Sequence, residues 1–437
     1  MFGMRRSRRG LCITTPPSGR RPLAQKPRLL LVAPPDSYRI AAYLKAAHSL
    51  NVDLQIASRG EHSLVGEIAA GVHINLDDER QALERILHSA RDNPYRSVIA
   101  PDDYTVELAA KIAQALGLQH NPPAAARFSR RKDLAREQLR KHHIPTPEFR
   151  RIDLDKELKT QIADFPFPCV VKPVSLSGSR GVIRADNEAQ FVTACARIKN
   201  IVSTQSKDYD KSTLLVEKYI PGIEVAVEGF LTDGEFRPLA LFDKPDPLEG
   251  PFFEETYYIT PSRLPVERQQ HIFQQVQAAC QAYGLKTGPV HAELRLHDNQ
   301  AWIIEVAART IGGECAQLLK FGTGYSLEQL VIAHSMGLAV DVKPMEEAAG
   351  VLMIPTPKSG ILRRVEGVLA AQKMPLIESV TISVREGHEL QTLPEGNSYL
   401  GFIFARGPGP QAVEEALRQA HSLLNIVVGP LWKLEAV

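Results

Sequence analysis

The hydrophobic pattern of the first 125 residues predicts strands that alternate with helices. Three short apolar runs are typical of strands buried in a parallel sheet, and they occupy 28–35, 53–57 and 97–100. Stretches with apolar residues at helical spacing lie between and after them, at 38–49, 82–87 and 106–116. This alternation predicts an open α/β sheet of roughly 100 residues.

A different pattern begins near residue 126, where a predicted helix leads to a strand that ends in Lys172-Pro173. The strand enters a small-residue loop (175–181) that contains Ser175, Ser177, Gly178, Ser179 and Gly181. Glycine lets a backbone approach an anion closely, successive N–H groups can surround phosphate oxygens, and the lysine adds a positive charge. An ordinary turn has the same glycine- and serine-rich composition, and no Walker motif is present. On its own it leaves a phosphate site and a simple turn both open.

Two glutamates flank a predicted reversal of the chain at Pro221-Gly222. An apolar strand precedes this turn and an alternating strand follows it, so Glu217 and Glu224 could face one cleft. The alternative is an edge hairpin with solvated glutamates.

A predicted hairpin around the polar turn His297–Gln300 is the most informative stretch. With the loop centred on Asn299, the facing pairs Ala292/Val306, Leu294/Ile304 and Leu296/Trp302 form one apolar face. On the other face Glu293 lies directly across from Glu305. Facing Cβ atoms are about 4.5–5.5 Å apart, so two carboxylates there repel unless a cation lies between them. Carboxylate oxygens suit Mg²⁺ or Mn²⁺. The alternative is two exposed glutamates, and a one-residue shift of register would remove the pairing.

Residues 346–437 are predicted to form a third unit of several strands and one helix, at 411–424. No group of catalytic residues is evident in this region. We therefore expect it to pack over the active site and shape specificity, or to contribute to a homodimer.

The composition excludes several classes of protein. A chain of 437 residues suggests two or three domains, and 44% hydrophobic with 23% charged residues is close to the globular average. No apolar run approaches the roughly 18 to 20 residues that cross a bilayer, so no membrane partner is expected. The five cysteines are widely spaced and form no CxxC pair. This argues against a disulfide framework or a zinc site and for a reducing, cytoplasmic compartment.

The net charge of +2 is unevenly distributed. Eight arginines and lysines and no acid precede residue 29, so the rest of the chain carries −6 and offers no basic surface for nucleic acid. Residues 1–27 are predicted to be a disordered basic tail, either a solvated or upstream-start extension or, as the alternative, a targeting segment.

The order and spacing of these motifs resemble the ATP-grasp superfamily. The resemblance rests on Lys132, on Lys172 with its loop, on E-x-x-I-x-G-x-E at 217–224, and on the facing glutamates. The sequence EVAARTIGG at 305–313 is closer still to the L-amino acid ligases that make dipeptides. The resemblance covers about 30–437 and implies an α/β (α+β) fold. Its domains would be an N-terminal open α/β domain (28–125), an ATP-grasp domain (126–345) with a lid subdomain (about 165–220), and a C-terminal α+β domain (346–437).

The resemblance implies roles in binding ATP. Lys132 and Lys172 match the lysines that neutralise the phosphates, and Glu224 matches the acid that binds the ribose. The loop that closes over the phosphates would contain Ser177, Gly178 and Ser179. The segment that reads adenine would be Glu217, Lys218, Tyr219 and Ile220.

The resemblance also implies the metal site and the catalytic residues. Glu293 and Glu305 match the ligands of Mg²⁺ (or Mn²⁺), and Arg309 matches the residue that holds the acyl-phosphate and its tetrahedral successor. Most ATP-grasp enzymes have asparagine two residues after the second glutamate. This chain has Ala307 there, as in the amino acid ligases. The metal must then draw more on phosphate and water.

The substrate side is implied by FFEETYYITPS at 252–262. Glu255 matches the acid that holds the ammonium group of the first amino acid, whereas Tyr258 stands where those enzymes often carry histidine. Tyrosine, with a pKa near 10, is a poor general base at neutral pH, so another group deprotonates the amine or the acceptor differs. In Gly312-Gly313, some relatives have a bulky residue at the second position, and Gly313 is expected to leave a roomier pocket.

The resemblance implies an ATP-dependent carboxylate–amine ligase that joins two L-amino acids through an acyl-phosphate and releases ADP and phosphate. Its partners would be small-molecule amino acids. A ligase that forms an amide on a non-protein amino acid or specialised metabolite is the first alternative. A non-catalytic ATP-binding regulator is a more distant one, because the lysines, the glutamates and Arg309 are retained together. The sequence does not identify either amino acid.

Overall fold

The computed structural model describes residues 26–60, 71–204, 208–343, 347–396 and 399–431. The basic tail predicted at 1–27 therefore lies almost wholly outside the described residues. Among the residues described, no helix is long and apolar enough to span a membrane. Four of the five cysteines are described, and all four are buried and free.

The N-terminal region is a parallel sheet, as its sequence pattern predicts. The strand order is β3-β2-β1-β4, formed by Gly71–His73, Asp53–Ser58, Arg28–Val32 and Ser97–Ile99. Its helices are α1 (Ile40–Ser49), α3 (Glu79–Ser89) and α4 (Asp103–Ala115). Strand β3 was not predicted, because three residues are too few to produce a periodic pattern.

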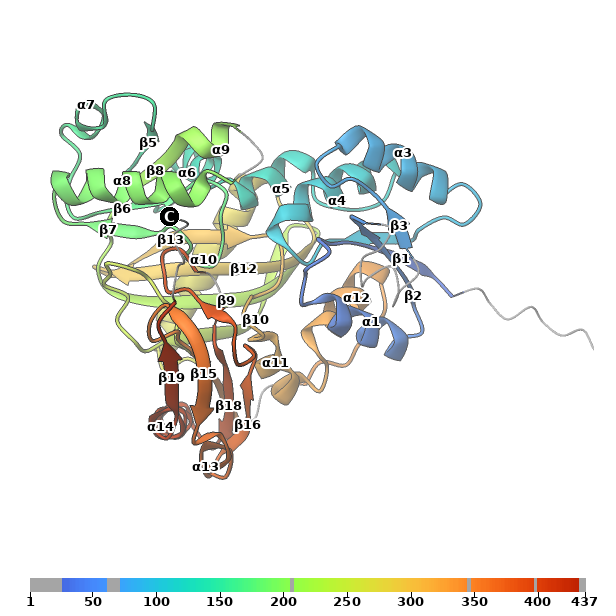
Figure 1. The fold of residues 1–437 in the computed structure, drawn as a ribbon. Coiled ribbons are helices and arrows are strands. Elements are labelled where there is room, and N and C mark those ends of the chain that lie inside the picture. Colours follow the sequence, from blue (N-terminus) through green and yellow to red (C-terminus); the bar gives the residue numbers. More distant parts are fainter. Residues whose placement is uncertain (1–25, 61–70, 205–207, 344–346, 397–398, 432–437) are drawn as a thin grey trace, which may run out of the picture.

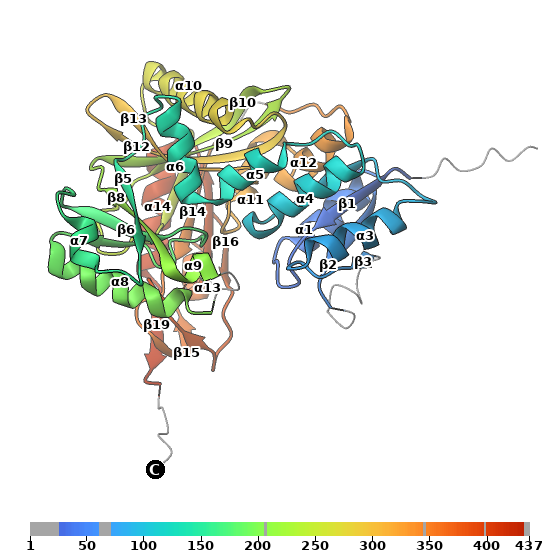
Figure 2. The ribbon, with the colours of Figure 1, turned by 90° about the horizontal axis from the view of Figure 1, so that it is seen from above.

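A small antiparallel sheet carries the strand that leads into the small-residue loop. Its order is β5-β8-β6-β7, formed by Phe149–Asp153, Thr213–Lys218, Cys169–Pro173 and Ile183–Ala185. The surrounding helices are α5 (Pro123–Arg130), α6 (Lys132–Lys141), α7 (Leu158–Ile162), α8 (Glu188–Val202) and α9 (Asp208–Ser212). Figures 1 and 2 show this sheet and the parallel sheet at opposite sides of the molecule.

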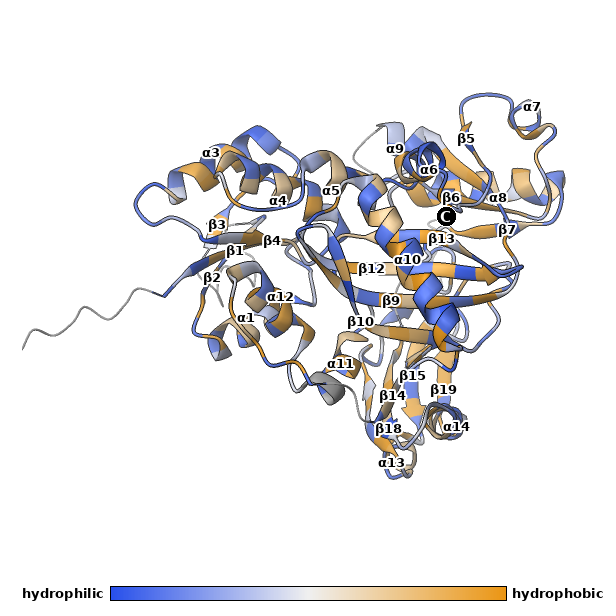
Figure 3. Cartoon of the chain, turned by 180° about the vertical axis from the view of Figure 1, so that it is seen from behind, coloured by the Kyte–Doolittle hydropathy of each residue, from blue (hydrophilic) through white to orange (hydrophobic). Residues whose placement is uncertain are grey.

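A large antiparallel sheet of eight strands forms the centre of the fold. Its first five strands, in the order β13-β12-β9-β10-β11, are Gln300–Ala307, Gly288–His297, Ile223–Thr232, Glu235–Lys244 and Tyr257–Thr260. One face packs on α10 (Val266–Tyr283), which crosses the sheet in Figure 3. Alternate residues therefore point to the other face, where charged side chains collect.

The edge hairpin given as the alternative at Pro221-Gly222 is wrong. Strand β8 pairs with β5 and β6, whereas β9 pairs with β10 and β12, so this turn passes the chain from the small sheet to the large one. Glu217 and Glu224 consequently lie in different sheets.

The pairing of Glu293 with Glu305 is confirmed, but the path to it differs from the prediction. The turn has two residues with positive φ, Asp298 (49°) and Asn299 (61°), so Leu294 pairs with Ile303 and Leu296 with Ala301. The predicted pairs with Ile304 and Trp302 are wrong. A bulge then shifts the register by one residue, which leaves Ile304 unpaired and brings the two glutamates opposite each other.

The C-terminal region continues the large sheet instead of forming a separate layer. Strands β14 (Ala348–Ile354), β18 (Gly401–Gly407) and β16 (Ile377–Ile382) extend it beyond β11. A small sheet is formed by β17 (Glu389–Leu390), β15 (Gly360–Glu366) and β19 (Asn425–Gly429), with α13 (Val368–Gln372) and α14 (Pro410–Ser422) alongside. Helices α11 (Ala316–Thr323) and α12 (Leu327–Met336) lie in the chain between β13 and β14, that is, before the C-terminal region begins. Helix α12 packs on α1 of the N-terminal region (Figure 1).

Candidate active site

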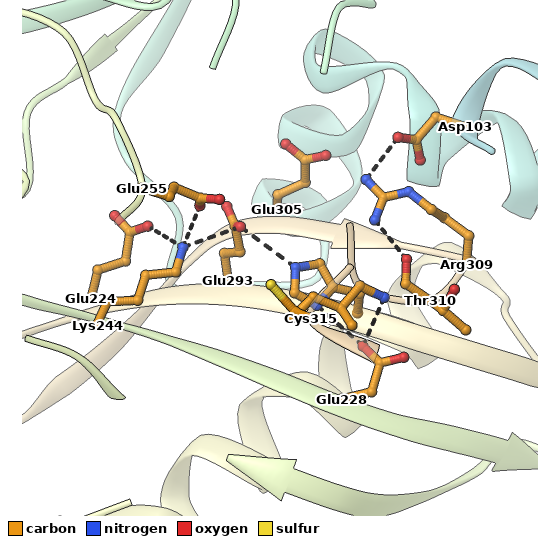
Figure 4. Close-up of polar contacts among 12 residues, drawn as sticks. Asp103, Glu224, Glu228, Lys244, Glu255, Glu293, Glu305, Arg309, Thr310 and Cys315 are labelled. Atoms are coloured by element: carbon orange, nitrogen blue, oxygen red, sulfur yellow. Dashed lines mark hydrogen bonds and ion pairs between the residues drawn. The ribbon is translucent and has the colours of Figure 1, made fainter. Parts of the chain in front are cut away.

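The charged face of the large sheet brings together residues from four adjacent strands (Figure 4). Three cross-strand pairs define it, namely Glu224 with Lys244, Glu228 with His291, and Glu293 with Glu305. Because residues two apart on a strand share a face, all six side chains point to the same side of the sheet.

Lys244, which the sequence analysis did not single out, lies at the centre of three glutamates. Its Nζ is 2.8 Å from Glu224, 2.5 Å from Glu255 and 3.2 Å from Glu293. We call these three glutamates the carboxylate cluster; one oxygen of each lies within 4.8 Å of the others. Burial alone lowers the pKa of Lys244, but the carboxylates outweigh it and hold that pKa well above its usual value. The cluster is thus partly neutralised by the protein itself.

The acids of the cluster differ in how easily they ionise. Burial, together with the nearby charge of Glu293, raises the pKa of Glu255 to about 7 in spite of Lys244. Burial also opposes ionisation of Glu293, but Lys244 and His291 hold its pKa well below the usual range. Glu255 is therefore the acid of this pair that accepts a proton first.

Both expected metal ligands hold cationic side chains. Glu293 contacts Lys244 and lies 3.5 Å from Nε2 of His291, while Oε2 of Glu305 lies 3.1 Å from Nζ of Lys132. Lys244, His291 and Lys132 thus place positive charge beside the two carboxylates that would bind a divalent cation. Two facing carboxylates are the hard oxygen donors that Mg²⁺ and Mn²⁺ prefer, so the residues present fit such an ion.

The small-residue loop lies between Lys132 and the C-terminal region. Gly178 and Ser179 both adopt positive φ, at 65° and 53°, and the ammonium group of Lys132 donates to the carbonyl of Leu176 at 2.8 Å. At the other end, the N–H of Gly181 donates to the carbonyl of Pro394 at 2.9 Å. Ser177 directly follows Leu176, so the expected loop residues begin next to the carbonyl that Lys132 holds.

Lys172 does not point freely into this space. Its Nζ is 2.7 Å from Oε2 of Glu217, and Nε of Arg136 is 2.8 Å from Oε1 of the same carboxylate. Burial opposes ionisation of both partners, and it lowers the pKa of Lys172; the two cations nevertheless hold the pKa of Glu217 below its usual value. Beyond Glu217, the strand ends in an exposed Lys218 followed by Tyr219 and Ile220, which are buried.

Arg309 is held by the N-terminal region, a contact that the sequence analysis missed. Its Nη2 is 2.7 Å from Oδ2 of Asp103, and its Nη1 donates to the carbonyl of Thr310 at 2.9 Å. Burial alone would lower the pKa of Arg309, but Asp103 raises it, so the guanidinium stays charged. Figure 4 shows Arg309 on the far side of Glu305 from the carboxylate cluster.

The turn after Arg309 (the 309–313 turn) is also anchored by the N-terminal region. Arg39 donates to Oγ1 of Thr310 at 2.6 Å and to the carbonyl of Ile311 at 2.9 Å, and the hydroxyl of Tyr38 accepts the N–H of Gly313 at 3.1 Å. These contacts join residues more than 270 positions apart, so no local pattern could reveal them.

Gly313 does not open free space beside the turn. It has φ of 60°, and a Cβ there would come within 2.7 Å of Sδ of Met353. The roomier pocket expected at this position is therefore occupied by methionine. At Gly312 the nearest atom to such a Cβ would be Nη2 of Arg39, at 3.7 Å, an ordinary contact.

Tyr258 is buried beside the cluster and is packed as an aromatic core residue. Its ring meets that of Phe242 edge-on at 5.8 Å, and Nζ of Lys244 lies 5.0 Å from the ring centre. Burial raises its pKa well above 10. At neutral pH the phenol is therefore protonated and cannot act as a general base.

Comparison with known proteins identifies two regions. Residues 165–317 match the ATP-grasp domain, and residues 352–429 match the L-amino acid ligase C-terminal domain 2. The crystal structure of an L-amino acid ligase from Bacillus licheniformis has a TM-score of 0.77 and 25% identity, covering 92% of this chain and 99% of that one.

The curated relatives match over a smaller part of their length. Alanine–anticapsin ligase of Bacillus subtilis is 25% identical over 271 residues, which are 58% of this chain and 57% of that protein. Carnosine synthase 1 of Gallus gallus is 28% identical over 313 residues, 67% of this chain and 33% of that protein. The match thus spans little more than half of the first relative and a third of the second. The chain contains an ATP-grasp domain and an L-amino acid ligase C-terminal domain, as the order of its motifs indicated, and it has the ATP-grasp fold.

Proposed function

We propose, from this homology with ATP-grasp ligases, that the chain is an ATP-dependent carboxylate–amine ligase. In the proposed reaction it joins two L-amino acids into a dipeptide through an acyl-phosphate and releases ADP and phosphate. The observation that carries the proposal is the Glu293/Glu305 pair, which faces Lys132 and the small-residue loop in a chain that continues into an L-amino acid ligase domain.

The first step needs an activated carboxyl group, because a carboxylate is a poor electrophile. Transfer of the γ-phosphoryl group of ATP to it creates an acyl-phosphate with phosphate as the leaving group. When bound, a divalent cation neutralises charge on the transferring group, and Glu293 and Glu305 would hold it. Lys132, 3.1 Å from Glu305, would neutralise further phosphate charge. The small-residue loop would exclude water, which would otherwise hydrolyse the intermediate.

The second step is attack by the amine, and its transition state develops an oxyanion. Arg309 is largely buried and charged, and a guanidinium can hold phosphate and carboxyl oxygens in fork geometry. For this role it must share its donors between Asp103 and the substrate. Tyr258 takes no proton at neutral pH, so deprotonation of the amine falls to another group.

The first amino acid would bind with its ammonium group at Glu255, within the carboxylate cluster. Three carboxylates and one lysine leave negative charge that an ammonium group or a metal can offset. Lys244 nevertheless already lies 2.5 Å from Glu255. This contact favours a second candidate, a ligase that forms an amide on a non-protein amino acid or specialised metabolite and whose carboxylate substrate places no α-ammonium group at Glu255.

The test is a screen for phosphate release with ATP, Mg²⁺ and all pairs of amino acids, followed by mass spectrometry of the products. The dipeptide proposal expects at least one pair that releases phosphate and yields a mass equal to both amino acids minus water. Absence of phosphate release for every pair would contradict it. The same screen with carboxylic acids that lack an α-amino group distinguishes the second candidate from the dipeptide ligase, because only the second candidate would release phosphate with them.

A further inference from the structure

A fully buried glutamate lies beside the carboxylate cluster without belonging to it. Glu228, on β9, has an exposure of 0%. Its Oε2 accepts hydrogen bonds from Nδ1 of His291 at 3.2 Å and from the backbone N–H of Ile311 at 3.1 Å. Its Oε1 has no partner among the described residues. Burying a carboxylate is unfavourable, and an apolar side chain would often serve the sheet equally well. The contacts made by Oε2 therefore indicate what this carboxylate does in the fold.

His291 connects Glu228 to the expected metal ligand. It is the cross-strand partner of Glu228, and its other nitrogen, Nε2, lies 3.5 Å from Oε1 of Glu293. The two nitrogens lie on opposite sides of a rigid ring, so a contact at one of them fixes the direction of the other. Partners that orient a metal ligand in this way typically change metal affinity or activity 10- to 100-fold when removed.

Ile311 connects Glu228 to the 309–313 turn. Its N–H is held by Glu228 from the sheet, and its carbonyl is held by Arg39 from the N-terminal region. The peptide units that follow Arg309 are thus fixed from two sides. A continuous chain of contacts runs from Glu293 through His291 and Glu228 to this turn (Figure 4).

We propose that Glu228 and His291 are a positioning pair that aligns the carboxylate of Glu293 with the 309–313 turn. The proposal rests on the proposed function for the chemistry that the alignment serves. Neither residue is required to touch a substrate. Together they couple the place where a metal is held to the turn that carries Arg309, so a displacement at one end is transmitted to the other.

The experiment measures Mn²⁺ binding to the full chain by electron paramagnetic resonance, with and without ADP, beside steady-state kinetics. His291→Asn keeps a donor near the position of Nδ1 but cannot reach Glu293. We expect it to weaken Mn²⁺ binding in the presence of ADP about 10-fold or more. Binding of ADP without metal should stay within about two-fold of the wild type, and kcat should fall with little change in the KM for ATP.

Glu228→Gln tests the other end of the pair, because it keeps an acceptor for Ile311 but removes the charge. We expect kcat to fall about 10-fold. The double variant should lose less than the product of the two single losses, since both changes interrupt one chain of contacts. If Glu228→Gln does not fold, the comparison of His291→Asn with the control still decides the question.

Asp243→Asn is the matched control. Asp243 is a largely buried carboxylate on the neighbouring strand β10, and it holds Ser262 and Arg263 outside the pair. Wild-type Mn²⁺ affinity in His291→Asn would overturn the proposal, and so would an equal loss in Asp243→Asn. If the wild type binds Mn²⁺ and ADP but releases no phosphate with any amino acid pair, the proposed function fails while the binding experiment still tests the pair.

Discussion

Glu395 holds the guanidinium group of Arg197 with both carboxylate oxygens, at 2.6 and 2.8 Å. Arg197 lies on α8, behind the small-residue loop, whereas Glu395 belongs to the C-terminal region. Next to this pair, Nε of Arg180 donates to the carbonyl of Glu395 at 3.0 Å. The C-terminal region therefore contacts both the loop expected to cover the phosphates and the helix behind it.

Glu395→Gln should weaken closure of this loop. The two side chains are each 42% exposed, so the pair is worth at most about 1 kcal/mol, or roughly a five-fold effect. Looser closure admits water, so we expect the ratio of phosphate released to amide formed to rise about two- to five-fold. Glu366→Gln, which breaks an exposed pair with Arg364 on β15, is the control. An unchanged ratio, or an equal rise in the control, would argue against the contact.

Glu305→Gln should abolish phosphate release while the fold remains intact. The change removes one of two facing carboxylates and the partner of Lys132, so neither the metal nor the phosphate charge is held in place. Phosphate release is measured at saturating Mg²⁺, with thermal unfolding as the check on folding. Near-normal turnover would contradict the metal assignment.

Arg309→Lys should separate nucleotide binding from product formation. Lysine keeps the charge near Asp103 but loses the fork that also reaches the carbonyl of Thr310. We expect ATP affinity to stay within a few-fold and product formation to fall by roughly 10²-fold, the usual loss for one oxyanion donor. A parallel collapse of ATP binding, measured by calorimetry, would place Arg309 in the nucleotide site instead.

Glu255→Ala should be far more damaging than Tyr258→Phe. Glu255 is the expected partner of the substrate ammonium group, whereas the Tyr258 phenol stays protonated in its aromatic contact with Phe242. Tyr258→Phe should mainly raise the KM for one amino acid. Amino-acid-dependent ADP formation compares the two variants. An inactive Tyr258→Phe beside an active Glu255→Ala would favour a first substrate that is not an α-amino acid.

Lys244→Met should destabilise the fold by about 3 kcal/mol, the lower end for a buried ion pair, because three partly buried carboxylates would lose the buried cation that they share. Urea unfolding measures the change, and millimolar Mg²⁺ should restore part of it by supplying the missing charge. Lys111→Met is the control, since Lys111 pairs with Glu79 and Glu107 at the surface and should cost less than about 1 kcal/mol. A similarly small loss in Lys244→Met would mean that the cluster does not depend on lysine.

The sequence predicted the parallel sheet and the facing glutamates because both follow from local periodicity. The glutamate pair was nevertheless reached through an incorrect turn, since a bulge at Ile304 compensates for the two-residue loop at Asp298-Asn299. A regular hairpin counted from that loop would have placed Glu293 opposite Ile304.

Lys244 was missed for the same physical reason. Asp233-Gly234 is a recognisable hairpin signal, but regular pairing from it places Lys244 opposite Ile223. A bulge at Leu239 moves the partner to Glu224. The contacts of Arg309 with Asp103 and of Arg39 with Thr310 depend on how the N-terminal region docks, which no periodicity in the chain encodes.

Strand β14 pairs with β11 along Tyr257–Thr260, which begins two residues after Glu255. A chimera joined between α12 and β14 would therefore place a foreign strand against the segment expected to bind the first amino acid. Recombination between relatives at that point would exchange part of the substrate pocket together with the C-terminal region. In this fold, substrate preference and the C-terminal region should be inherited as one unit.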